Sequence, residues 1–448
     1  MMRASYKQHT FIALWAFCPV LTAATFSYAG VGDTEIATWK DNLGGALSLT
    51  IDDALDDRED TLAILDDFGV KGTFFLNTGD LLARPALQAA MVGASQNGHE
   101  IASHTLTHPD LTNKNDADLD SELRESQEIL EGLINKPVIS LAYPFGADDA
   151  RVRAATAQYY LSGRDVYPDA LHPATGQDMY RLGEAPGPFN WTDAEFIQER
   201  LNFATSAATT GGWAIEMYHN LGSPGTLNRE LYHTETAFRG HLTNLTSGSL
   251  SLWVAPVGEV VQYYLSREGA SLSTSFPGGD EMTVELTLTD PTGRIATPLT
   301  LSTTVPGAWA SGGTLEVRQN GDLLPFTQGS TGSDLLLSYN ALPNGGDVLL
   351  SVAAPSPDGD FDDDNDVDGA DFLIWQTGAG VGATAAEGDA NGNGVIDGDD
   401  LAIWETQYGG PPPLATATAA VPEPTSLLLL QLAGLMGMAG ARTRRSVS

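Results

Sequence analysis

The sequence of 448 residues contains very little cysteine and few basic side chains. Its single cysteine, Cys18, has no partner for an internal disulfide, and it lies in an N-terminal segment that we expect to be removed. Lysine and arginine number 22 against 58 aspartates and glutamates, so the formal net charge is −36. This balance argues against a nucleic-acid partner, because phosphate binding requires a basic surface. A hydrophobic content of 42% argues against global disorder, and the length indicates about two to four domains.

The N-terminal segment has the pattern of an export signal. Two basic residues precede an apolar run from Phe11 to about Ala24, and the small-x-small triplet Ser27-Tyr28-Ala29 follows. The run is shorter than the roughly 20 residues that a membrane-spanning helix needs. The pattern therefore predicts a secretory signal peptide over residues 1–29.

The C-terminal segment has the pattern of a second targeting signal. The motif Val421-Pro422-Glu423-Pro424 is followed by an apolar run from Leu427 to Gly440 and by three arginines. Residues 421–448 resemble a PEP-CTERM sorting tail, which implies removal by an exosortase; a plain C-terminal anchor is the alternative. The Pro/Ala/Thr-rich residues 411–420 are a predicted linker. Either reading places the protein outside the inner membrane, secreted or associated with the cell surface.

Between the two ends, the sequence pattern changes near Ala270. Over residues 34–268, strand-like apolar runs alternate with helical patterns, which predicts an α/β fold with a parallel barrel. Over residues 270–354, short alternating runs without helical periodicity predict a small β-sandwich. The predicted barrel strands are Ala46–Ile51, Gly72–Asn77, the Ile101 region, Val138–Ala142, Tyr159–Ser162, Trp213–Tyr218 and Leu252–Ala255.

An acidic block follows, in which residues 358–400 carry 13 Asp and Glu and no Lys or Arg. Segments 360–378 and 389–407 repeat one pattern of oxygen donors, as a hard cation such as calcium requires. Residues 358–410 resemble a type I dockerin, two calcium loops each followed by a short helix, which implies docking to a cohesin-like protein. The predicted calcium ligands are Asp360, Asp362, Asp364, Asp368, Asp371, Asp389, Asn391, Asn393, Asp397 and Asp400.

Two segments of the predicted barrel carry side chains suited to metal chemistry. Asp52 and Asp53 end an apolar strand, and parallel barrels build active sites at that end of their strands. His104 and His108 are four residues apart, so one helical turn would place both imidazoles on one side. One Asp and two His form a three-ligand site with open positions, which is typical of a catalytic metal. The second, adjacent Asp is then a candidate general base.

These segments resemble the motifs of the NodB-homology polysaccharide deacetylases, carbohydrate esterase family 4. Thr50–Ala54 resembles the family's TFDDG motif, and His104–His108 matches its H(S/T)xxH motif. Ala142–Phe145 lies where the RxP(Y/F) motif is expected, and Met217–His219 where the motif with the catalytic histidine is expected. The resemblance covers about residues 34–268 and implies a distorted (β/α) barrel that removes acetyl groups from sugars with the help of a metal.

The resemblance also implies roles for single residues. Asp52 would be the base that takes a proton from the attacking water, and a backbone N–H near Phe145 would help to hold the oxyanion. His219, protonated, would donate to the departing amine or alcohol. A divalent metal, with zinc expected, would be held by Asp53, His104 and His108.

The sequence departs from the family pattern at three positions. Ala54 replaces a glycine, and Ala142 replaces the motif-three arginine that pairs with the base, for which Arg164 is the candidate substitute. Glu216 replaces an apolar residue that would border the acetyl pocket. Asp165 is a candidate to orient the catalytic histidine.

The sequence thus predicts an exported, metal-dependent deacetylase that acts on an acetylated polysaccharide, with N-acetyl groups favoured. An O-acetyl esterase acting on xylan-like glycans is one alternative. A surface adaptor with a degenerate barrel, which binds through its calcium module, is another.

Overall fold

The computed structural model describes residues 30–410, except 54–57, 168–170, 186–191, 222–231, 291, 296, 312 and 354–356. The predicted signal peptide, the linker, the sorting tail and Ala54 therefore lie outside the described residues. The chain divides into two units, Met1–Ala308 with Val317–Leu350, and Trp309–Glu316 with Ser351–Ser448. Among the described residues, no helix has both the length and the apolar character needed to cross a membrane.

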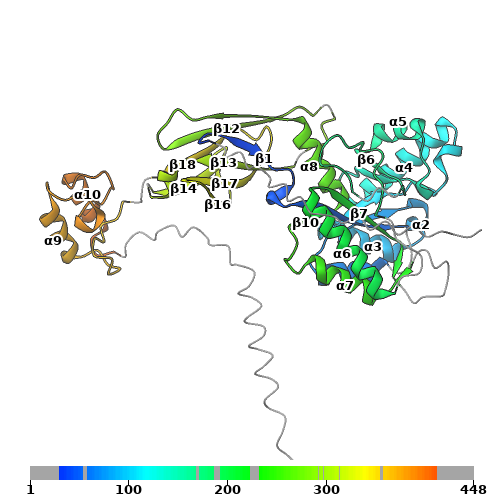
Figure 1. The fold of residues 1–448 in the computed structure, drawn as a ribbon, viewed down its shortest axis with the longest axis horizontal. Helices are drawn as coiled ribbons and strands as arrows, with labels where there is room; N and C mark the ends of the chain where they lie inside the picture. Colours follow the sequence, from blue (N-terminus) through cyan, green and yellow to red (C-terminus); the bar gives the residue numbers. More distant parts are fainter. Residues whose placement is uncertain are drawn as a thin grey trace, which may run out of the picture. The chain divides into compact units, whose positions relative to one another are not determined.

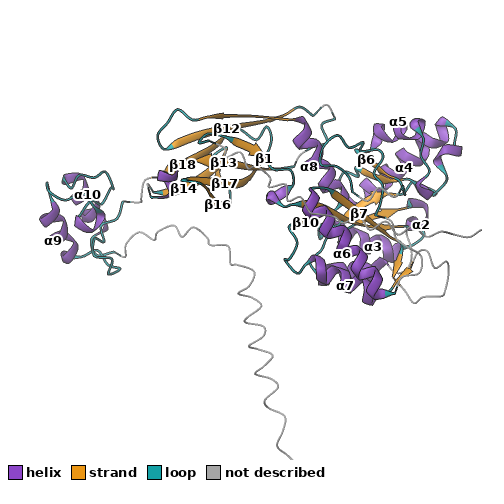
Figure 2. Cartoon of the chain, in the orientation of Figure 1, coloured by secondary structure: helices purple, strands orange, loops and turns teal. Residues whose placement is uncertain are grey.

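The first unit begins with the predicted α/β fold, and its parallel sheet is confirmed (Figures 1 and 2). Strand β2 (Gly45–Asp52) pairs in parallel with β7 on one side and with β10 and β3 on the other. The sheet continues through β4 and β5 to β6. Its other strands are β3 (Thr73–Leu76), β4 (Glu100–Ser103), β5 (Ser140–Ala142), β6 (Ser162–Arg164), β7 (Trp213–Tyr218) and β10 (Leu252–Val254).

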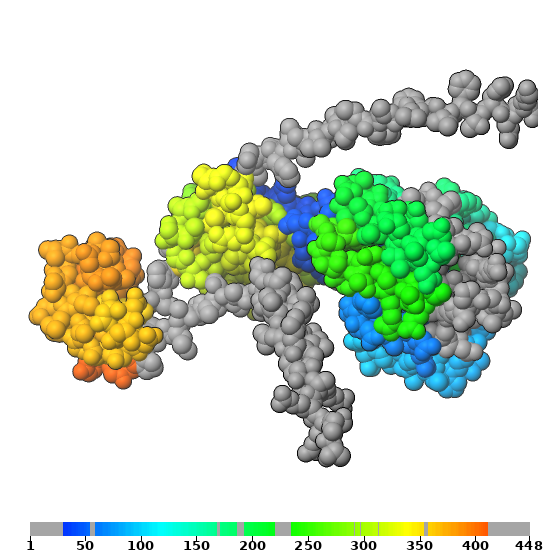
Figure 3. All heavy atoms as spheres, turned by 60° about the horizontal axis from the view of Figure 1, so that its bottom comes forward, coloured from blue at the N-terminus to red at the C-terminus, as the bar shows by residue number. Residues whose placement is uncertain are grey.

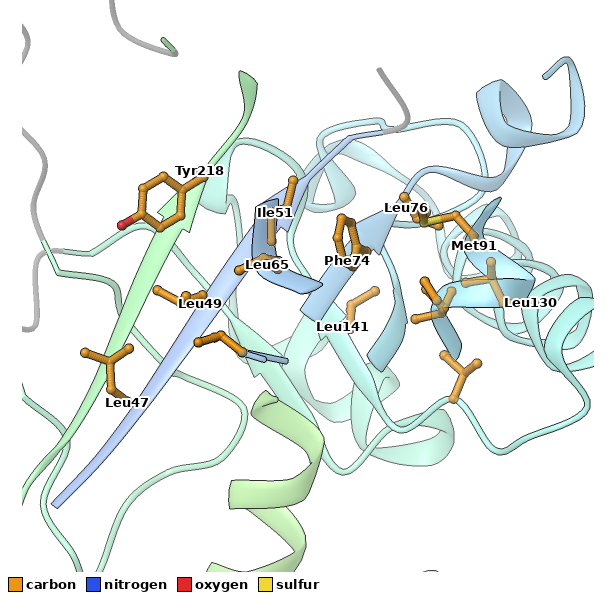
Figure 4. Close-up of a cluster of buried hydrophobic side chains, with 14 of the residues drawn as sticks. Leu47, Leu49, Ile51, Leu65, Phe74, Leu76, Met91, Leu130, Leu141 and Tyr218 are labelled. Atoms are coloured by element: carbon orange, nitrogen blue, oxygen red, sulfur yellow. The ribbon is translucent and has the colours of Figure 1, made fainter. Parts of the chain in front are cut away.

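Strand β2 is buried along its whole length, and its two faces differ in chemistry. Successive side chains of a strand point to opposite faces, so Leu47, Leu49 and Ile51 share one face. These three pack in the main apolar cluster with side chains such as Phe74 and Tyr218 (Figure 4). The other face carries Ser48, Thr50 and Asp52, all buried. The alternation therefore places the Asp52 carboxylate at the carboxyl end of a strand that is packed in the core.

The helices follow the strands in the alternating order that the sequence predicts. In α4, the Asn115 side chain accepts from the N–H of Asp118, and the helix stops at Asn135, which adopts left-handed φ of 53°. Helix α4 buries Leu119, Leu123 and Leu130 on one face. The helices are α1 (Arg58–Asp67), α2 (Thr78–Leu82), α3 (Pro85–Gln96), α4 (Asp116–Ile134), α5 (Ala150–Tyr159), α6 (Asp193–Thr210), α7 (Glu235–Leu245) and α8 (Val257–Gly269).

One predicted strand is misplaced. Residues 150–159 form helix α5, and β6 begins only at Ser162, so the prediction of a strand over Tyr159–Ser162 is wrong by about three residues. The error arises because two tyrosines close the helix, and aromatic residues also favour strands.

An irregular segment links the two ends of the parallel sheet. The N–H of Leu182 donates to Gly163 of β6, and the N–H of Ala185 donates to Ile215 of β7. His172 and Trp213 exchange backbone hydrogen bonds in the same region. Backbone pairing thus runs from β6 through this segment to β7, without a regular strand at that place.

Two further sheets follow in the region of the predicted β-sandwich (Figure 2). One has the order β1-β13-β17-β16 and the other β11-β12-β18-β14-β15. Their strands are β1 (Thr34–Ile36), β11 (Ala270–Ser275), β12 (Glu281–Leu288), β13 (Leu299–Val305), β14 (Thr314–Gln319), β15 (Asp322–Leu323), β16 (Phe326–Thr331), β17 (Asp334–Ala341) and β18 (Val348–Ala353).

The first of these sheets corrects the predicted domain boundary at residue 34. Strand β1 lies outside the parallel sheet and pairs antiparallel with β13, with Thr34 opposite Thr303. Asn42, just after β1, donates to Ser302 and Ser338 of the same sheet. The space-filling view shows this N-terminal segment between the yellow strands and the green helices (Figure 3). Residues near the N-terminus therefore belong to the β-sheet region, which local periodicity does not reveal.

The second unit contains two short helices, α9 (Gly369–Gly378) and α10 (Gly398–Gln407). Each is preceded by one of the two acidic loops and begins with a capping box, formed by Asp368 with Asp371 and by Asp397 with Asp400. The two halves of the repeat thus have the same local structure.

Candidate metal centre

A carboxylate and two imidazoles converge at the carboxyl end of the parallel sheet. The Asp53 Oδ1 atom lies 3.7 Å from His104 Nε2 and 3.5 Å from His108 Nε2. The two imidazole Nε2 atoms are 3.2 Å apart. The structure therefore brings together the three side chains predicted to bind a metal, and all three potential ligand atoms lie within 4.8 Å of one another.

The backbone that carries these residues is not helical. Asp53 has φ of 69°, Thr105, which follows His104, has φ of 67°, and His108 has φ of 59°. Left-handed conformations are uncommon outside glycine and mark positions that the surroundings hold in place. The predicted helical turn from His104 to His108 is therefore wrong, although both imidazoles still face Asp53. The Thr105 hydroxyl accepts a hydrogen bond from the His108 N–H and stabilises this turn.

The ring of His104 is oriented by a backbone carbonyl. Its Nδ1 atom lies 2.8 Å from the Ala142 carbonyl oxygen, so Nδ1 carries the proton and Nε2 presents its lone pair to the triad. Burial is the main cause that lowers the pKa of His104, to about 4, which keeps the ring neutral near pH 7. A neutral imidazole with a free lone pair, a second imidazole and a carboxylate fit a divalent transition metal.

Asp52 lies beside the triad and is paired with a buried arginine. The Arg164 guanidinium donates directly to Asp52 Oδ2, and both side chains are almost fully buried. Burial alone would raise the pKa of Asp52, but the charge of Arg164 and its hydrogen bond to the carboxylate contribute to lowering it below the usual value. Arg164 and Ala142 are paired residues of neighbouring strands, so the arginine lies one strand away from the position where the family motif places it.

The two other predicted catalytic groups lie around the same centre. His219 directly follows β7, is half-buried, and influences the pKa of Asp52. Phe145 has φ of 59° in the short 3-10 turn Pro144–Gly146. Its ring packs edge-on against the His108 ring, with centroids 4.7 Å apart.

Glu216 does not border the metal centre, which corrects the prediction. Its carboxylate accepts hydrogen bonds from Tyr218 Oη at 2.7 Å and from His241 Nε2 at 2.9 Å, on the helix-covered side of β7. Alternation instead places Met217 toward the centre, where its sulfur lies 3.2 Å from an Arg164 nitrogen. The strand was predicted with its observed bounds, Trp213–Tyr218, but strand bounds do not show which of its faces packs against the helices.

Burial alone would raise the pKa of Glu216, but the nearby His241 and Arg200 and the hydrogen bonds from His241 and Tyr218 lower it. The carboxylate is therefore ionised although it is fully buried, and it connects β7 with α7.

Two further acids, the buried Asp165 and the half-buried Glu184, lie near the centre. Asp165 accepts a hydrogen bond from the Tyr167 N–H and lies 3.9 Å from Arg181, and burial raises its pKa to about 6. Its predicted role in orienting the catalytic histidine stays a prediction. Burial also raises the pKa of Glu184 to about 7, and the carboxylate lies close enough to Asp52 and Arg164 for their charges to affect that pKa. No motif marks Glu184 in the sequence, because its burial follows from the irregular segment.

Residues 40–162 match the family model for polysaccharide deacetylase. The chain contains a polysaccharide deacetylase domain of the NodB-homology type. The matched range includes the triad, Asp52 and Phe145, and it ends before Arg164 and His219.

Among curated relatives of the chain, a gellan lyase from Bacillus sp is 28% identical over 343 residues, 73% of this chain and 14% of that protein. Chitin deacetylase 1 from Cryptococcus neoformans is 30% identical over 98 residues, 22% of this chain and 20% of that protein. The chain thus spans a small part of both relatives. Among solved structures, the family 4 carbohydrate esterase from Streptomyces lividans in complex with acetate is 21% identical with a TM-score of 0.34, over 47% of this chain and 92% of that chain.

We predict that Glu216→Gln destabilises the deacetylase domain in a pH-dependent way. The folded-state pKa of Glu216 is lowered, so its ionised form stabilises the fold above the unfolded pKa of about 4.3, and that contribution is lost as pH falls through the folded pKa. Urea unfolding should show a loss of about 2 kcal/mol at pH 7 that shrinks toward pH 3.5.

The matched control is Glu128→Gln, whose side chain is 62% exposed in a surface ion pair and should change stability by less than about 0.5 kcal/mol. An equal loss for Glu216→Gln at pH 7 and at pH 3.5 would contradict the ionised cluster.

Proposed function

We propose that the chain is an exported polysaccharide deacetylase whose barrel removes acetyl groups, N-acetyl groups first, with a divalent metal held by Asp53, His104 and His108. The main support for the proposal is the position of Asp52, which is buried beside this triad and accepts a hydrogen bond from Arg164. A carboxylate held ionised next to a candidate metal centre is suited to accept a proton from water. The deacetylase domain match and the names of the relatives agree in pointing to carbohydrate polymers.

The metal, when bound, supplies a Lewis acid that polarises the acetyl carbonyl and makes water easier to deprotonate. The protein supplies the other parts. Asp52 takes a proton from the attacking water, and Arg164 keeps Asp52 oriented and ionised until then. The backbone N–H of Phe145, in its left-handed turn, is the proposed donor to the carbonyl oxygen as negative charge develops there.

His219 is the proposed acid that gives a proton to the leaving group. It follows β7 directly and lies close enough to Asp52 for their charges to interact. An acid on one side of the acetyl group and a base on the other permit water to enter and the amine or alcohol to leave. Zinc is the metal that we propose, because two imidazoles and one carboxylate are typical zinc ligands.

Asp52→Asn should abolish acetate release and leave zinc binding intact. The amide cannot accept the proton, but the three ligands remain. We would measure acetate from N-acetylglucosamine oligomers and from acetylated xylan with the zinc-loaded full chain, and zinc by isothermal titration. A fall of at least about a hundredfold, or about 2.7 kcal/mol in activation free energy, is expected.

The matched control for that measurement is Asp116→Asn, whose side chain is 91% exposed and which should behave as the wild type. Release of acetate from xylan alone would favour the O-acetyl esterase. Zinc binding with no acetate from either substrate would favour the surface adaptor, and activity of Asp52→Asn would refute the assignment of the base.

The two acidic loops of the second unit support a proposal of calcium binding. In the first loop, Asp360 accepts from the N–H groups of Asp364 and Asn365, and in the second, Asp389 accepts from those of Asn393 and Gly394. Asp360, Asp362 and Asp364 also bring three ligand atoms within 4.8 Å of one another. Both loops thus fold around their first aspartate in the same way.

The helices after the loops are related by the same repetition. Trp375 Nε1 donates to the Asp397 carbonyl, and Trp404 Nε1 donates to the Asp368 carbonyl, each at 2.9 Å. Each tryptophan thus ties its own helix to the start of the other. Asp364 and its neighbours raise the pKa of Asp366, a sign of crowded negative charge that a bound cation would relieve. We propose that this dockerin-like module binds a cohesin-like partner when it is loaded with calcium.

Calcium titration of the full chain should show two sites, and Asp360→Asn should weaken one of them at least about tenfold, or about 1.4 kcal/mol. Asp360 is buried, and the variant removes one charge from the first loop only. The control Asp399→Asn, an exposed residue outside the ligand positions, should leave both affinities unchanged. Equal effects of the two variants would contradict a calcium site in the first loop.

The export signal and the sorting tail lie in residues that the structure does not describe, and they are the basis of the proposed location of the protein. We propose secretion through the N-terminal signal peptide and processing of residues 421–448 by an exosortase. Both are consistent with a polysaccharide substrate outside the cytoplasm.

A further inference from the structure

Helix α4 carries two polar side chains on its buried face. Besides its three buried leucines, the helix buries Glu122 and Ser126, which lie four residues apart and therefore on one side of the helix. A buried carboxylate is costly unless its oxygens accept hydrogen bonds. The hydrogen-bond partners of Glu122 and Ser126 therefore show which part of the domain this face of α4 holds.

Glu122 accepts two hydrogen bonds from the residue that directly precedes His108. The Thr107 N–H donates to Glu122 Oε2 at 2.8 Å, and the Thr107 hydroxyl donates to Glu122 Oε1. The N–H of Leu106 also donates to the backbone carbonyl of Glu122, at 3.2 Å. Because both oxygens of one carboxylate hold donors of the same residue, the position and the orientation of Thr107 are both fixed.

The start of the same turn is held by further hydrogen bonds. Ser126 Oγ lies 2.7 Å from Ser103 Oγ, which accepts from the N–H of Thr105 at 3.2 Å. The Thr105 carbonyl accepts from the N–H of Thr78 in α2 at 3.1 Å. These contacts hold Thr105 in its left-handed conformation, which costs energy for a residue other than glycine. All three residues between the two histidines thus hydrogen-bond to α2 or α4.

The two histidines differ in how their rings are held. The His104 side chain is 3% exposed, and its Nδ1 atom is hydrogen-bonded to the Ala142 carbonyl, outside the triad. The His108 side chain is 25% exposed, and its ring packs edge-on against the rings of His104 and Phe145, each with centroids 4.7 Å apart. Ring contacts restrict rotation less than a hydrogen bond does, so the direction of the His108 ring depends on the backbone of the turn.

We propose that Glu122 is a positioning residue for the metal centre, which holds Thr107 and thereby keeps the His108 imidazole directed toward Asp53 and His104. This inference rests on the proposed metal-dependent function and adds a residue from outside the motifs that resemble the family. Side chains that orient metal ligands raise metal affinity, and their loss typically weakens it by about ten- to a hundredfold. A turn that is already ordered also spares the ion the entropic cost of ordering it.

The test measures the zinc affinity of the full chain by competition with a chelator, with calcium in excess to occupy the acidic loops. We compare the wild type, Glu122→Gln and the control Glu131→Gln. Glu131 lies on the same helix and accepts from the N–H of Val138 at 3.0 Å, at the amino end of the parallel sheet. In Glu122→Gln, an NH₂ donor replaces one acceptor oxygen and faces a donor of Thr107. Zinc affinity should fall about tenfold in Glu122→Gln and stay at the wild-type value in Glu131→Gln.

Thr107→Val provides a second variant, because it removes only the hydroxyl donor of an exposed residue. Its zinc affinity should fall about threefold. The double variant Glu122→Gln/Thr107→Val should lose less than the product of the two single effects, because both changes act on one contact. Cobalt(II) in place of zinc reports on the arrangement of the ligands through its visible absorption, which should change in Glu122→Gln and not in Glu131→Gln.

The outcomes separate the positioning role from the proposed function. Wild-type zinc affinity and an unchanged cobalt spectrum in Glu122→Gln overturn the role of Glu122 and leave the metal centre intact. Equal losses in Glu122→Gln and Glu131→Gln, or fully additive effects of the Glu122 and Thr107 changes, also overturn it. If Glu122→Gln does not fold, wild-type zinc affinity of Thr107→Val overturns it. A selective loss of zinc affinity, with no acetate released by the wild type, supports the role and refutes the deacetylase. No zinc binding by the wild type refutes the metal centre and the role together.

Discussion

The candidate site depends on one buried ion pair, between Asp52 and Arg164. Removing two charges from water is costly, and only close, hydrogen-bonded geometry compensates for it. The fold provides that geometry because Asp52 ends the fully buried strand β2 and Arg164 ends β6. The pair keeps a carboxylate ionised within the protein, and the adjacent Asp53 turns in a left-handed conformation toward the two histidines.

The surrounding structure supports this pair from several sides. β5 lies beside β6 and offers the Ala142 carbonyl to His104, so the position that lacks an arginine side chain still orients a predicted metal ligand. The irregular segment 171–185 pairs with both β6 and β7 and brings Glu184 close to the pair. On the other face of β7, the Glu216–His241 contact fixes the strand that leads to His219. Separate elements thus hold each part of the site.

The sequence was sufficient to predict the parallel sheet and the convergence of Asp53, His104 and His108, because buried strands and spaced ligands leave local patterns. Arg164 as the partner of Asp52 was predicted from its position, and the structure places it there. The predicted direction of the Glu216 side chain was wrong although its strand was predicted with the observed bounds, because the bounds do not show which face packs against α7. The pairing of β1 with β13 was not predicted, because it joins residues more than 260 positions apart.

We propose that Arg164 performs the task of the arginine that the family motif places at position 142. The most direct measurement is kcat/KM for acetate release by Arg164→Ala and by the double variant Ala142→Arg/Arg164→Ala, with zinc content measured for each. Since the two positions are paired on neighbouring strands, the double variant returns a guanidinium to the same face. We predict a loss of at least about a hundredfold for Arg164→Ala and a recovery of at least about tenfold in the double variant. Wild-type activity of Arg164→Ala, or no recovery in a folded, zinc-loaded double variant, would contradict the claim.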